Sequence, residues 1–233
     1  MTGRRLAVIP ARGGSKRLPK KNLMAIGGQP MLVWTIRAAL DSKLFDTVIV
    51  STDDEEISHL AEAAGARVPF VRDTHADDHS PVSMVTIDAI ERLQQSGDEF
   101  TTVAQLMANC PLRTASHIID AVRAFDASGT DFQVSCFRFG YMNPWWALRL
   151  NQDFTGTALF PEAWKARSQD LPPLYCPSGA IWLARPQALI KKQRFHGSGC
   201  TYFPMPWDAA IDIDDQEDFD LAEALLHRRR RHT

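Results

Sequence analysis

The chain has 233 residues, a formal net charge of -2 and 45% hydrophobic residues. A chain of this length buries roughly 70% of the surface that its unfolded form exposes, so one α/β core is expected. The near-neutral charge gives no global field to attract nucleic acid, and no apolar run is long enough to cross a membrane. The amino-terminal sequence lacks the apolar segment of a signal peptide. These features predict a single cytoplasmic domain over residues 1–233, with neither nucleic acid nor a membrane as a partner.

Short β-rich runs alternate with helical patterns through the first half of the chain. In order they read "LAVIP", "MLVWTIRAALDS", "TVIVS", "DEEISHLAEAAG", "VPFV", "VSMVTIDAIERLQQSG" and "TTVAQLM". Asp53 or Asp54 is suited to cap the second helix and Gly65 to end it, while Ser80 and Pro81 are suited to begin the third. Such alternation predicts βαβ units in a largely parallel sheet with helices on both faces.

The second half of the chain begins with a fourth helix and then changes character. "TASHIIDAVRAFDASG" has Ile118, Ile119, Val122 and Phe125 on one face and Gly129 just past its end. After "DFQVSCFRF", residues 140–173 are rich in aromatic residues and proline. Exposed aromatics in such a segment suggest a partner surface, so we interpret it as a dimerisation arm, with an active-site lid as the alternative.

The chain returns to the predicted sheet at "SGAIWLA" and continues through "YFPMP" and "AAIDID" to a helix near Asp215 to Arg228. Ligands of open parallel sheets bind beyond the carboxyl ends of the strands. The loops after Pro10, Ser51, Val71 and Met107 are therefore expected to converge on one site.

The loop within "IPARGGSKRLPKKN" carries two adjacent glycines and five cationic side chains. It matches neither the Walker A pattern nor the G-x-G-x-x-G fingerprint. Glycines let backbone N–H groups approach a ligand closely, and Arg12, Lys16 and Lys21 add positive charge around Gly13, Gly14 and Ser15. This combination predicts a site for a triphosphate, although a basic surface loop is the alternative.

Polar side chains occur in the other expected site loops. Asp212 and Asp214 are two residues apart in a segment expected to be extended, so both carboxylates would face the same way and could hold Mg²⁺ on a nucleotide. An acidic pair before a helix also serves as a cap. Asn109 and Arg113 follow the strand ending at Met107 and would face ligand, although Arg113 could instead neutralise a helix carboxylate. The loop after Val71 offers Arg72 and the polar run at residues 77–80 for a base or ribose.

In combination, these segments resemble the acylneuraminate cytidylyltransferases. The resemblance rests on "IPARGGSKRLPKKN", "FDTVIVSTDDEEI", "CPLRT", "RSQDLPPLYCPSGAIW" and "IDIDDQEDFDLAE", in the family's order and over nearly the whole chain. It implies a Rossmann-like three-layer nucleotide-diphospho-sugar transferase fold, with a mostly parallel central sheet and an extended dimerisation arm. It also implies a homodimer that uses CTP and Mg²⁺ to transfer CMP to the anomeric hydroxyl of a nonulosonic acid, releasing pyrophosphate.

The resemblance also implies roles for individual residues. Arg12, Lys21 and Asp214 would be catalytic, Asp212 and Asp214 would bind the metal, and Gln169 and Asp170 would border the sugar. Asn109 and Arg113 are added to the sugar side because of their position after the strand ending at Met107. The nucleotide-binding residues would be Ala11, Arg12, Gly13, Gly14, Ser15, Lys16, Lys21, Asn22, Arg72 and Ser83.

The motifs leave the sugar open. "VPFVR", "ADDHSP" and "RSQDLP" are similar to the pseudaminic acid branch of the family, whereas "SGAIW" is similar to the sialic or legionaminic branch. A 3-deoxy-manno-octulosonate cytidylyltransferase, another sugar nucleotidyltransferase and a catalytically silent nucleotide-binding homologue are the alternative functions.

Overall fold

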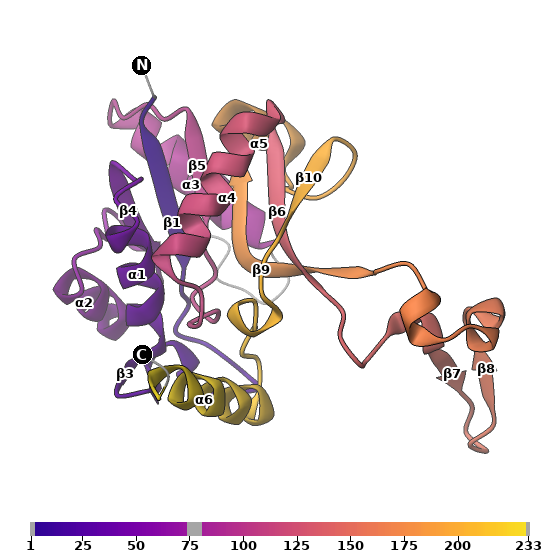
Figure 1. Cartoon of the computed structure of the whole chain (residues 1–233). Coiled ribbons are helices and arrows are strands. Elements are labelled where there is room, and N and C mark those ends of the chain that lie inside the picture. Colours follow the sequence, from indigo (N-terminus) through magenta and orange to yellow (C-terminus); the bar gives the residue numbers. More distant parts are fainter. Residues whose placement is uncertain (1–2, 74–80, 232–233) are drawn as a thin grey trace.

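The computed structural model describes residues 3–73 and 81–231, whose core is a six-stranded sheet with the order β10-β6-β9-β5-β1-β4 (Figure 1). β9 runs antiparallel to β5 and β6, and the other neighbouring strands are parallel. The strands are β1 (Arg5–Pro10), β4 (Thr47–Ser51), β5 (Thr102–Gln105), β6 (Phe132–Arg138), β9 (Tyr175–Ala184) and β10 (Cys200–Pro204). The predicted mixed α/β fold with a mostly parallel sheet is confirmed.

Helices cover both faces of this sheet and form three layers with it. One face packs against α1 (Met31–Asp41), α2 (Glu55–Ala63) and α4 (Ala115–Ser128), and the other packs against α3 (Val82–Gln95) and α5 (Pro186–Lys192). The alternation of side chains along β1 explains this arrangement. Ala7 and Ile9 contribute to the first apolar cluster, whereas Leu6 and Val8 contribute to the second. Every one of these four side chains is fully buried, as expected for a strand enclosed on both faces.

Local signals in the sequence explain where several helices begin and end. The Asp54 carboxylate accepts a hydrogen bond from the Ile57 N–H and caps α2. Gly129, with a φ of 65°, ends α4 in the left-handed region that glycine tolerates. α3 begins at Val82 after Pro81, and the predicted cap Ser80 lies outside the described residues.

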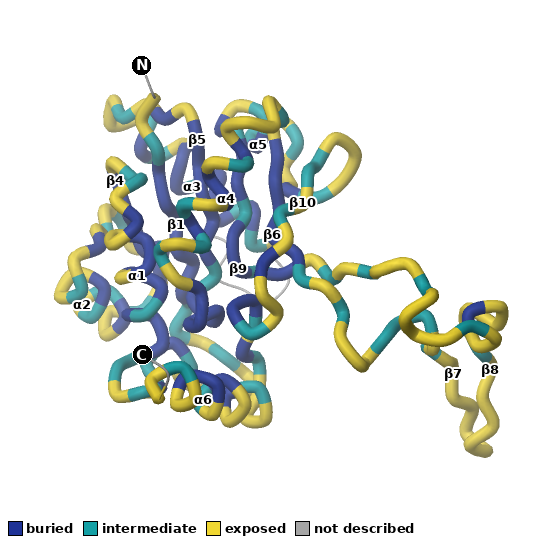
Figure 2. Tube along the Cα trace, in the orientation of Figure 1, coloured by how far each residue is buried: buried dark blue, intermediate teal, exposed yellow. Residues whose placement is uncertain are grey.

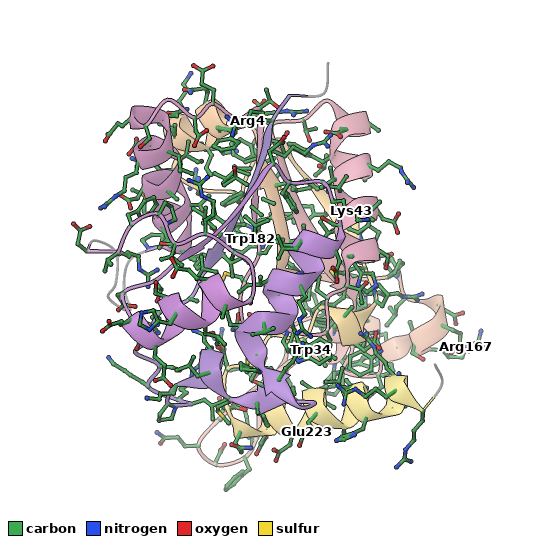
Figure 3. The ribbon with its side chains drawn as sticks, turned by 90° about the vertical axis from the view of Figure 1, so that its left-hand side faces the viewer. Arg4, Trp34, Lys43, Arg167, Trp182 and Glu223 are labelled. Atoms are coloured by element: carbon green, nitrogen blue, oxygen red, sulfur yellow. The ribbon has the colours of Figure 1, made fainter. Side chains whose placement is uncertain are left out.

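A third apolar cluster anchors the carboxyl-terminal helix α6 (Gln216–Arg230). Figure 3 shows α6, which carries Glu223, lying across one end of the molecule beside α1, which carries Trp34. Leu226 of α6 packs in this cluster with Ile26 of the short hairpin β2–β3 (Ala25–Ile26 and Gln29–Pro30) and with Ile213. α6 therefore packs in one cluster with Ile213, the residue between the two predicted aspartates.

Residues 140–173, which we call the arm, extend away from the sheet and its helices (Figure 1). The arm contains the hairpin β7–β8 (Leu148–Leu150 and Gly156–Ala158) and short 3-10 helices at Pro144–Trp146, Pro161–Lys165 and Ser168–Asp170. Most of it is exposed (Figure 2). The arm thus departs from the main body in the segment where the sequence loses its helical period.

Two segments that were expected to be extended form no strand. "VPFV" forms no strand, and only Arg67 makes an isolated bridge, to Ile49. Pro69 has no N–H to donate to a ladder, which explains why pairing stops there. The segment 211–214 is likewise not a strand.

Within residues 3–73 and 81–231, none of the helices combines the length and apolar character that a membrane span requires.

Candidate active site

The basic loop leaves β1 at the carboxyl end of the sheet. The Ala11 N–H donates to the Ser51 carbonyl at 3.0 Å, so the loop begins beside the end of β4. Lys20, with a φ of 54°, then turns the chain into a 3-10 turn at Lys21–Leu23. This geometry places Lys21 and Asn22 at the same end of the sheet as the start of the loop.

Lys21 connects this loop to the predicted aspartate pair. Its Nζ donates to Asp214 Oδ1 and to the Ile213 carbonyl, each at 2.9 Å. Lys21 and Asp214 are 193 residues apart in the sequence. Arg17 forms an ion pair with the other oxygen of the Asp214 carboxylate. The basic loop and the carboxyl-terminal aspartates therefore lie side by side in one chain.

The two aspartates differ in electrostatic environment. Although Asp212 as a residue is exposed, protein atoms partly desolvate its carboxylate, and this effect, with the nearby Asp214 charge, raises the pKa of Asp212 to about 6. Burial opposes ionisation of Asp214 as well, but Lys21 and Arg17 outweigh it and lower the pKa of Asp214. Asp214 is thus held as a carboxylate, whereas Asp212 makes no hydrogen bond or ion pair with the residues the structure describes.

Asn109 supports the same segment from the loop after β5. Its Nδ2 donates to the Ile213 carbonyl at 3.2 Å and lies 3.5 Å from Asp214 Oδ1, and its carbonyl accepts from the Ile213 N–H at 2.9 Å. Lys21 and Asn109 therefore approach the same two oxygens. The Asn109 Oδ1 atom is buried and has no hydrogen-bond partner among the described residues.

The carboxylate oxygens of Asp212 and Asp214 suit a hard cation such as Mg²⁺, which prefers a few carboxylates together with phosphate and water. The part of the chain that the structure describes contains no group of three or more histidine, cysteine, aspartate or glutamate side chains able to hold a metal alone. Asp212 and Asp214 supply two carboxylates, which fit a Mg²⁺ ion whose other ligands are phosphate and water. A cation there would also relieve the electrostatic cost of the Asp212 charge.

The two glycines of the basic loop have different surroundings. A Cβ on Gly13 would lie 2.4 Å from the Asp54 Oδ2 atom and 2.8 Å from its Cβ, so glycine is needed for the loop to pack on the β4–α2 turn. A Cβ on Gly14 would meet nothing within 4 Å. Packing within the described chain does not require glycine at Gly14, whereas close approach of a ligand to the backbone would.

Other predicted nucleotide-binding residues lie on neighbouring segments. The Asn22 Nδ2 donates to the Arg12 carbonyl at 3.0 Å, and the Arg72 N–H donates to the Thr52 carbonyl at 2.8 Å. Ser83 lies in the first turn of α3, where its hydroxyl donates to the Gln193 carbonyl at 2.9 Å. Asn22 and Arg72 are tied to the loops after β1 and β4, respectively.

The four predicted sugar-side residues are not brought together. Asn109 supports Ile213 and Asp214, whereas Arg113 is buried and donates to the Ala180 and Met107 carbonyls. Burial lowers the pKa of Arg113 to about 10. Gln169 and Asp170 lie in the arm, where Asp170 pairs with Arg167 at 2.8 Å.

Asp53 is a site residue that the sequence signals incompletely. A carboxylate directly after a strand, in "STDD", was equally consistent with a cap and with a ligand-facing role. The structure separates the two aspartates: Asp54 caps α2, whereas Asp53 accepts a hydrogen bond from the Gly13 N–H at 3.0 Å and lies 3.5 Å from the Arg72 Nη2. Only the fold brings Gly13 and Arg72 to the same carboxylate.

Comparison with known proteins identifies the family of the chain. The family described as "Cytidylyltransferase" matches residues 6–158. Pseudaminic acid cytidylyltransferase from Campylobacter jejuni subsp. jejuni serotype O:2 is 34% identical over 221 residues, which cover 94% of this chain and 95% of that protein. CMP-N,N'-diacetyllegionaminic acid synthase from Legionella pneumophila is 34% identical over 231 residues, with 95% of each chain covered.

A solved structure of CMP:2-keto-3-deoxy-manno-octonic acid synthetase, complexed with CTP, shares the fold with a TM-score of 0.73 and 18% identity, over 97% of this chain and 99% of that one.

Proposed function

This chain belongs to the cytidylyltransferase family, and we propose that it transfers CMP from CTP to the anomeric hydroxyl of a nonulosonic acid, releasing pyrophosphate. The observation that carries the proposal is the contact of Lys21 with Asp214 and the Ile213 carbonyl. This contact places a cationic glycine loop beside a carboxylate pair. A triphosphate with its metal needs both kinds of group at one site.

The substrate class is supported by the names of the relatives. Similar proteins are called cytidylyltransferases or CMP synthases of pseudaminic, legionaminic and N-acylneuraminic acids. All of these are nonulosonic acids. We favour a sugar of the pseudaminic type because "RSQDLP" is similar to that branch.

The roles proposed for the basic loop follow from its chemistry. The Gly13 N–H is engaged by Asp53, so the backbone N–H groups of Gly14 and Ser15 would bind phosphate oxygens, and Arg12, Lys16 and Lys21 would offset phosphate charge. Asn22, Arg72 and Ser83 would contact the cytidine. Asn22 is hydrogen-bonded to the Arg12 carbonyl and Arg72 to the Thr52 carbonyl. These bonds support nucleoside contacts directly beside the phosphate contacts.

In the proposed reaction, the anomeric oxygen forms a bond to the α-phosphorus of CTP and loses its proton, while the bond from that phosphorus to the pyrophosphate oxygen breaks. Both reactants are anions, so positioned positive charge is the main requirement. Asp212 and Asp214 would hold Mg²⁺, which when bound with CTP would offset charge on the phosphates. Lys21 would hold Asp214 in place and present its ammonium group to the phosphates. Arg12 would stabilise charge on the leaving group.

We further propose that the arm forms a homodimer with the arm or body of a second copy. Exposed apolar residues line it, with Tyr141 87%, Phe154 84% and Met142 70% exposed. Near the root of the arm, a hollow of about 460 Å³ is lined by Cys136, Tyr175, Pro177, Tyr202 and Pro204. Exposed apolar surface of this kind favours a protein partner. In such a dimer, Gln169 and Asp170 would border the sugar of the second copy.

The experiment that tests the function is a pyrophosphate-release screen. CTP is offered with pseudaminic, legionaminic, N-acetylneuraminic and 3-deoxy-manno-octulosonic acids, and UTP and GTP replace CTP in parallel. Release with CTP and a nonulosonic acid is expected. Release only with the octulosonic acid, or only with another nucleotide, would replace the proposal with a related transferase. Binding of CTP in calorimetry without release from any sugar acid would identify a catalytically silent homologue.

A further inference from the structure

Asp53 touches two segments to which the proposed function gives different tasks. Its Oδ1 accepts the Gly13 N–H at 3.0 Å, and the same oxygen lies 3.5 Å from the Arg72 Nη2. Gly13 belongs to the loop proposed to hold the phosphates, whereas Arg72 is proposed to contact the cytidine. One carboxylate oxygen thus lies between the two halves of the proposed nucleotide site.

Arg72 needs this carboxylate because its side chain is only 4% exposed. Its Nε and Nη2 atoms are buried without a hydrogen-bond partner in the described part of the chain. Burial lowers the pKa of Arg72, and the neighbouring Asp53 charge counteracts that effect. A buried cation without a countercharge is costly, so Asp53 supports both the charge and the orientation of Arg72.

Backbone contacts bring the same segments together. The Ala11 N–H donates to the Ser51 carbonyl at 3.0 Å, and the Arg72 N–H donates to the Thr52 carbonyl at 2.8 Å. Gly13 packs so closely on the turn that a Cβ there would overlap Asp54. The β4–α2 turn is therefore a platform on which both segments rest, and Asp53 is the side chain of that turn that reaches both.

We propose that Asp53 is a positioning residue that joins the phosphate-binding loop to Arg72 and so sets the geometry of both halves of the CTP site. The inference rests on the proposed function. It assigns Asp53 no contact with the reacting atoms.

Positioning and simple electrostatic repulsion predict opposite changes in CTP affinity when the Asp53 charge is removed. Asp53 is an anion near a site proposed to bind a more highly charged anion, so repulsion alone would make CTP bind more tightly to an uncharged variant. Positioning predicts weaker binding instead. The sign of the change therefore decides between the two.

The experiment compares Asp53→Asn, Asp53→Ala and the matched control Asp54→Asn. Asparagine at 53 keeps an acceptor for the Gly13 N–H but loses the countercharge of Arg72, whereas alanine loses both. Asp54→Asn makes the same charge change one residue away and keeps an oxygen for capping α2. CTP binding is measured by calorimetry without sugar, and thermal unfolding of each variant shows whether it is folded.

We expect the CTP Kd to rise about tenfold in Asp53→Asn, which loses the countercharge of buried Arg72, and further in Asp53→Ala, which also loses the hydrogen bond from the Gly13 N–H. In Asp54→Asn the Kd should stay within about twofold. In steady-state assays the KM for CTP should rise in the Asp53 variants while the KM for the sugar acid stays constant. A purely structural defect would instead lower the active fraction and leave the KM for CTP unchanged.

Asp53→Glu restores the charge but moves the carboxylate by one methylene, and it covers the case in which Asn or Ala fails to fold. Positioning predicts weaker CTP binding for this variant too. Unchanged or tighter binding in the folded Asp53 variants, or an equal loss in Asp54→Asn, would overturn the inference. If the unaltered protein itself bound no CTP, the proposed function would fail first.

Discussion

The candidate site and the arm are held together in different ways. In the site, hydrogen bonds join segments far apart in sequence, as between Lys21 and Asp214, Gly13 and Asp53, and Asn109 and Ile213. In the arm, side-chain contacts join Arg167 to Asp170, Asn151 to Thr155, and Trp145 to the Pro172 carbonyl, all residues of the arm itself. The site is a product of the whole fold, whereas these contacts of the arm stay within residues 140–173.

Burial separates the two regions as well (Figure 2). The loops of the site rest on the three apolar clusters of the body, whereas the arm carries many of the chain's exposed large apolar side chains. An arm with so little buried apolar surface derives little stability from packing against itself. The comparison shows that one chain brings the basic loop into contact with Asp53 and Asp214, whereas the arm leaves apolar surface uncovered, as the proposed dimer requires.

The largest expected effect is on folding stability, from the same substitution made in each region. Phe125 is fully buried under the sheet and Phe154 is 84% exposed in the arm. Phe125→Ala should lower the free energy of unfolding by about 3–5 kcal/mol because it leaves a cavity. Phe154→Ala should change it by no more than about 0.5 kcal/mol. Urea titration of dilute protein measures both, and equal losses would show that the arm is packed in solution.

The next effect is on catalysis and compares two lysines. Lys21→Ala should reduce kcat about a hundred- to a thousandfold with folding intact, as expected when a charge-stabilising donor is lost. The control is Lys165, which forms an exposed ion pair with Glu162 in the arm. Exposed ion pairs contribute little to stability. Lys165→Ala should leave kcat within about twofold. A Lys21→Ala enzyme of near-normal rate would remove Lys21 from the mechanism.

The features best predicted from the sequence are those with a local physical cause. The apolar face of α4 and the glycine after it required no knowledge of the fold, and the cap of α2 required only a choice between Asp53 and Asp54. The glycine loop after β1 was visible for the same reason, since its residue types have few other uses. Local causes therefore predicted the elements and the loop at the centre of the site.

The features that were missed depend on tertiary context. The antiparallel direction of β9 is decided by where the arm returns to the sheet, and no local pattern encodes that. Arg113 lies two residues after a proline in a site loop, yet its guanidinium turns inward to backbone carbonyls. The task of Asp53 depends on Gly13 and Arg72, which only the folded chain places on either side of it.

A third comparison concerns two asparagines. Asn109 approaches Ile213 and Asp214, whereas Asn151 bonds Thr155 within the arm. Since partners that orient a metal ligand commonly affect metal affinity by about 10–100-fold, Asn109→Ala should raise the Mg²⁺ concentration for half-maximal activity by that factor. Asn151→Ala should not change it. A metal titration at saturating CTP measures the effect, and calorimetric titration of Mg²⁺ into the CTP-bound protein provides a readout without turnover.

The same assay distinguishes the two interpretations of Asn109. If Asn109→Ala instead raises the KM for the sugar acid and leaves the Mg²⁺ dependence unchanged, Asn109 borders the sugar. Its contacts in the chain would then be secondary to that role.

The smallest expected effect is on self-association and tests what the arm is for. Leu150, 58% exposed in β7, and Leu221, 46% exposed on α6, are apolar side chains of the same kind in the two regions. An aspartate at an apolar interface must be desolvated without a partner, so Leu150→Asp should weaken a dimer by about tenfold or more. Leu221→Asp should leave the dimer unchanged. Sedimentation velocity over a range of concentrations measures both effects. If the unaltered protein is a monomer at every concentration, the lid becomes the better interpretation of the arm, because its apolar surface could then cover only its own chain.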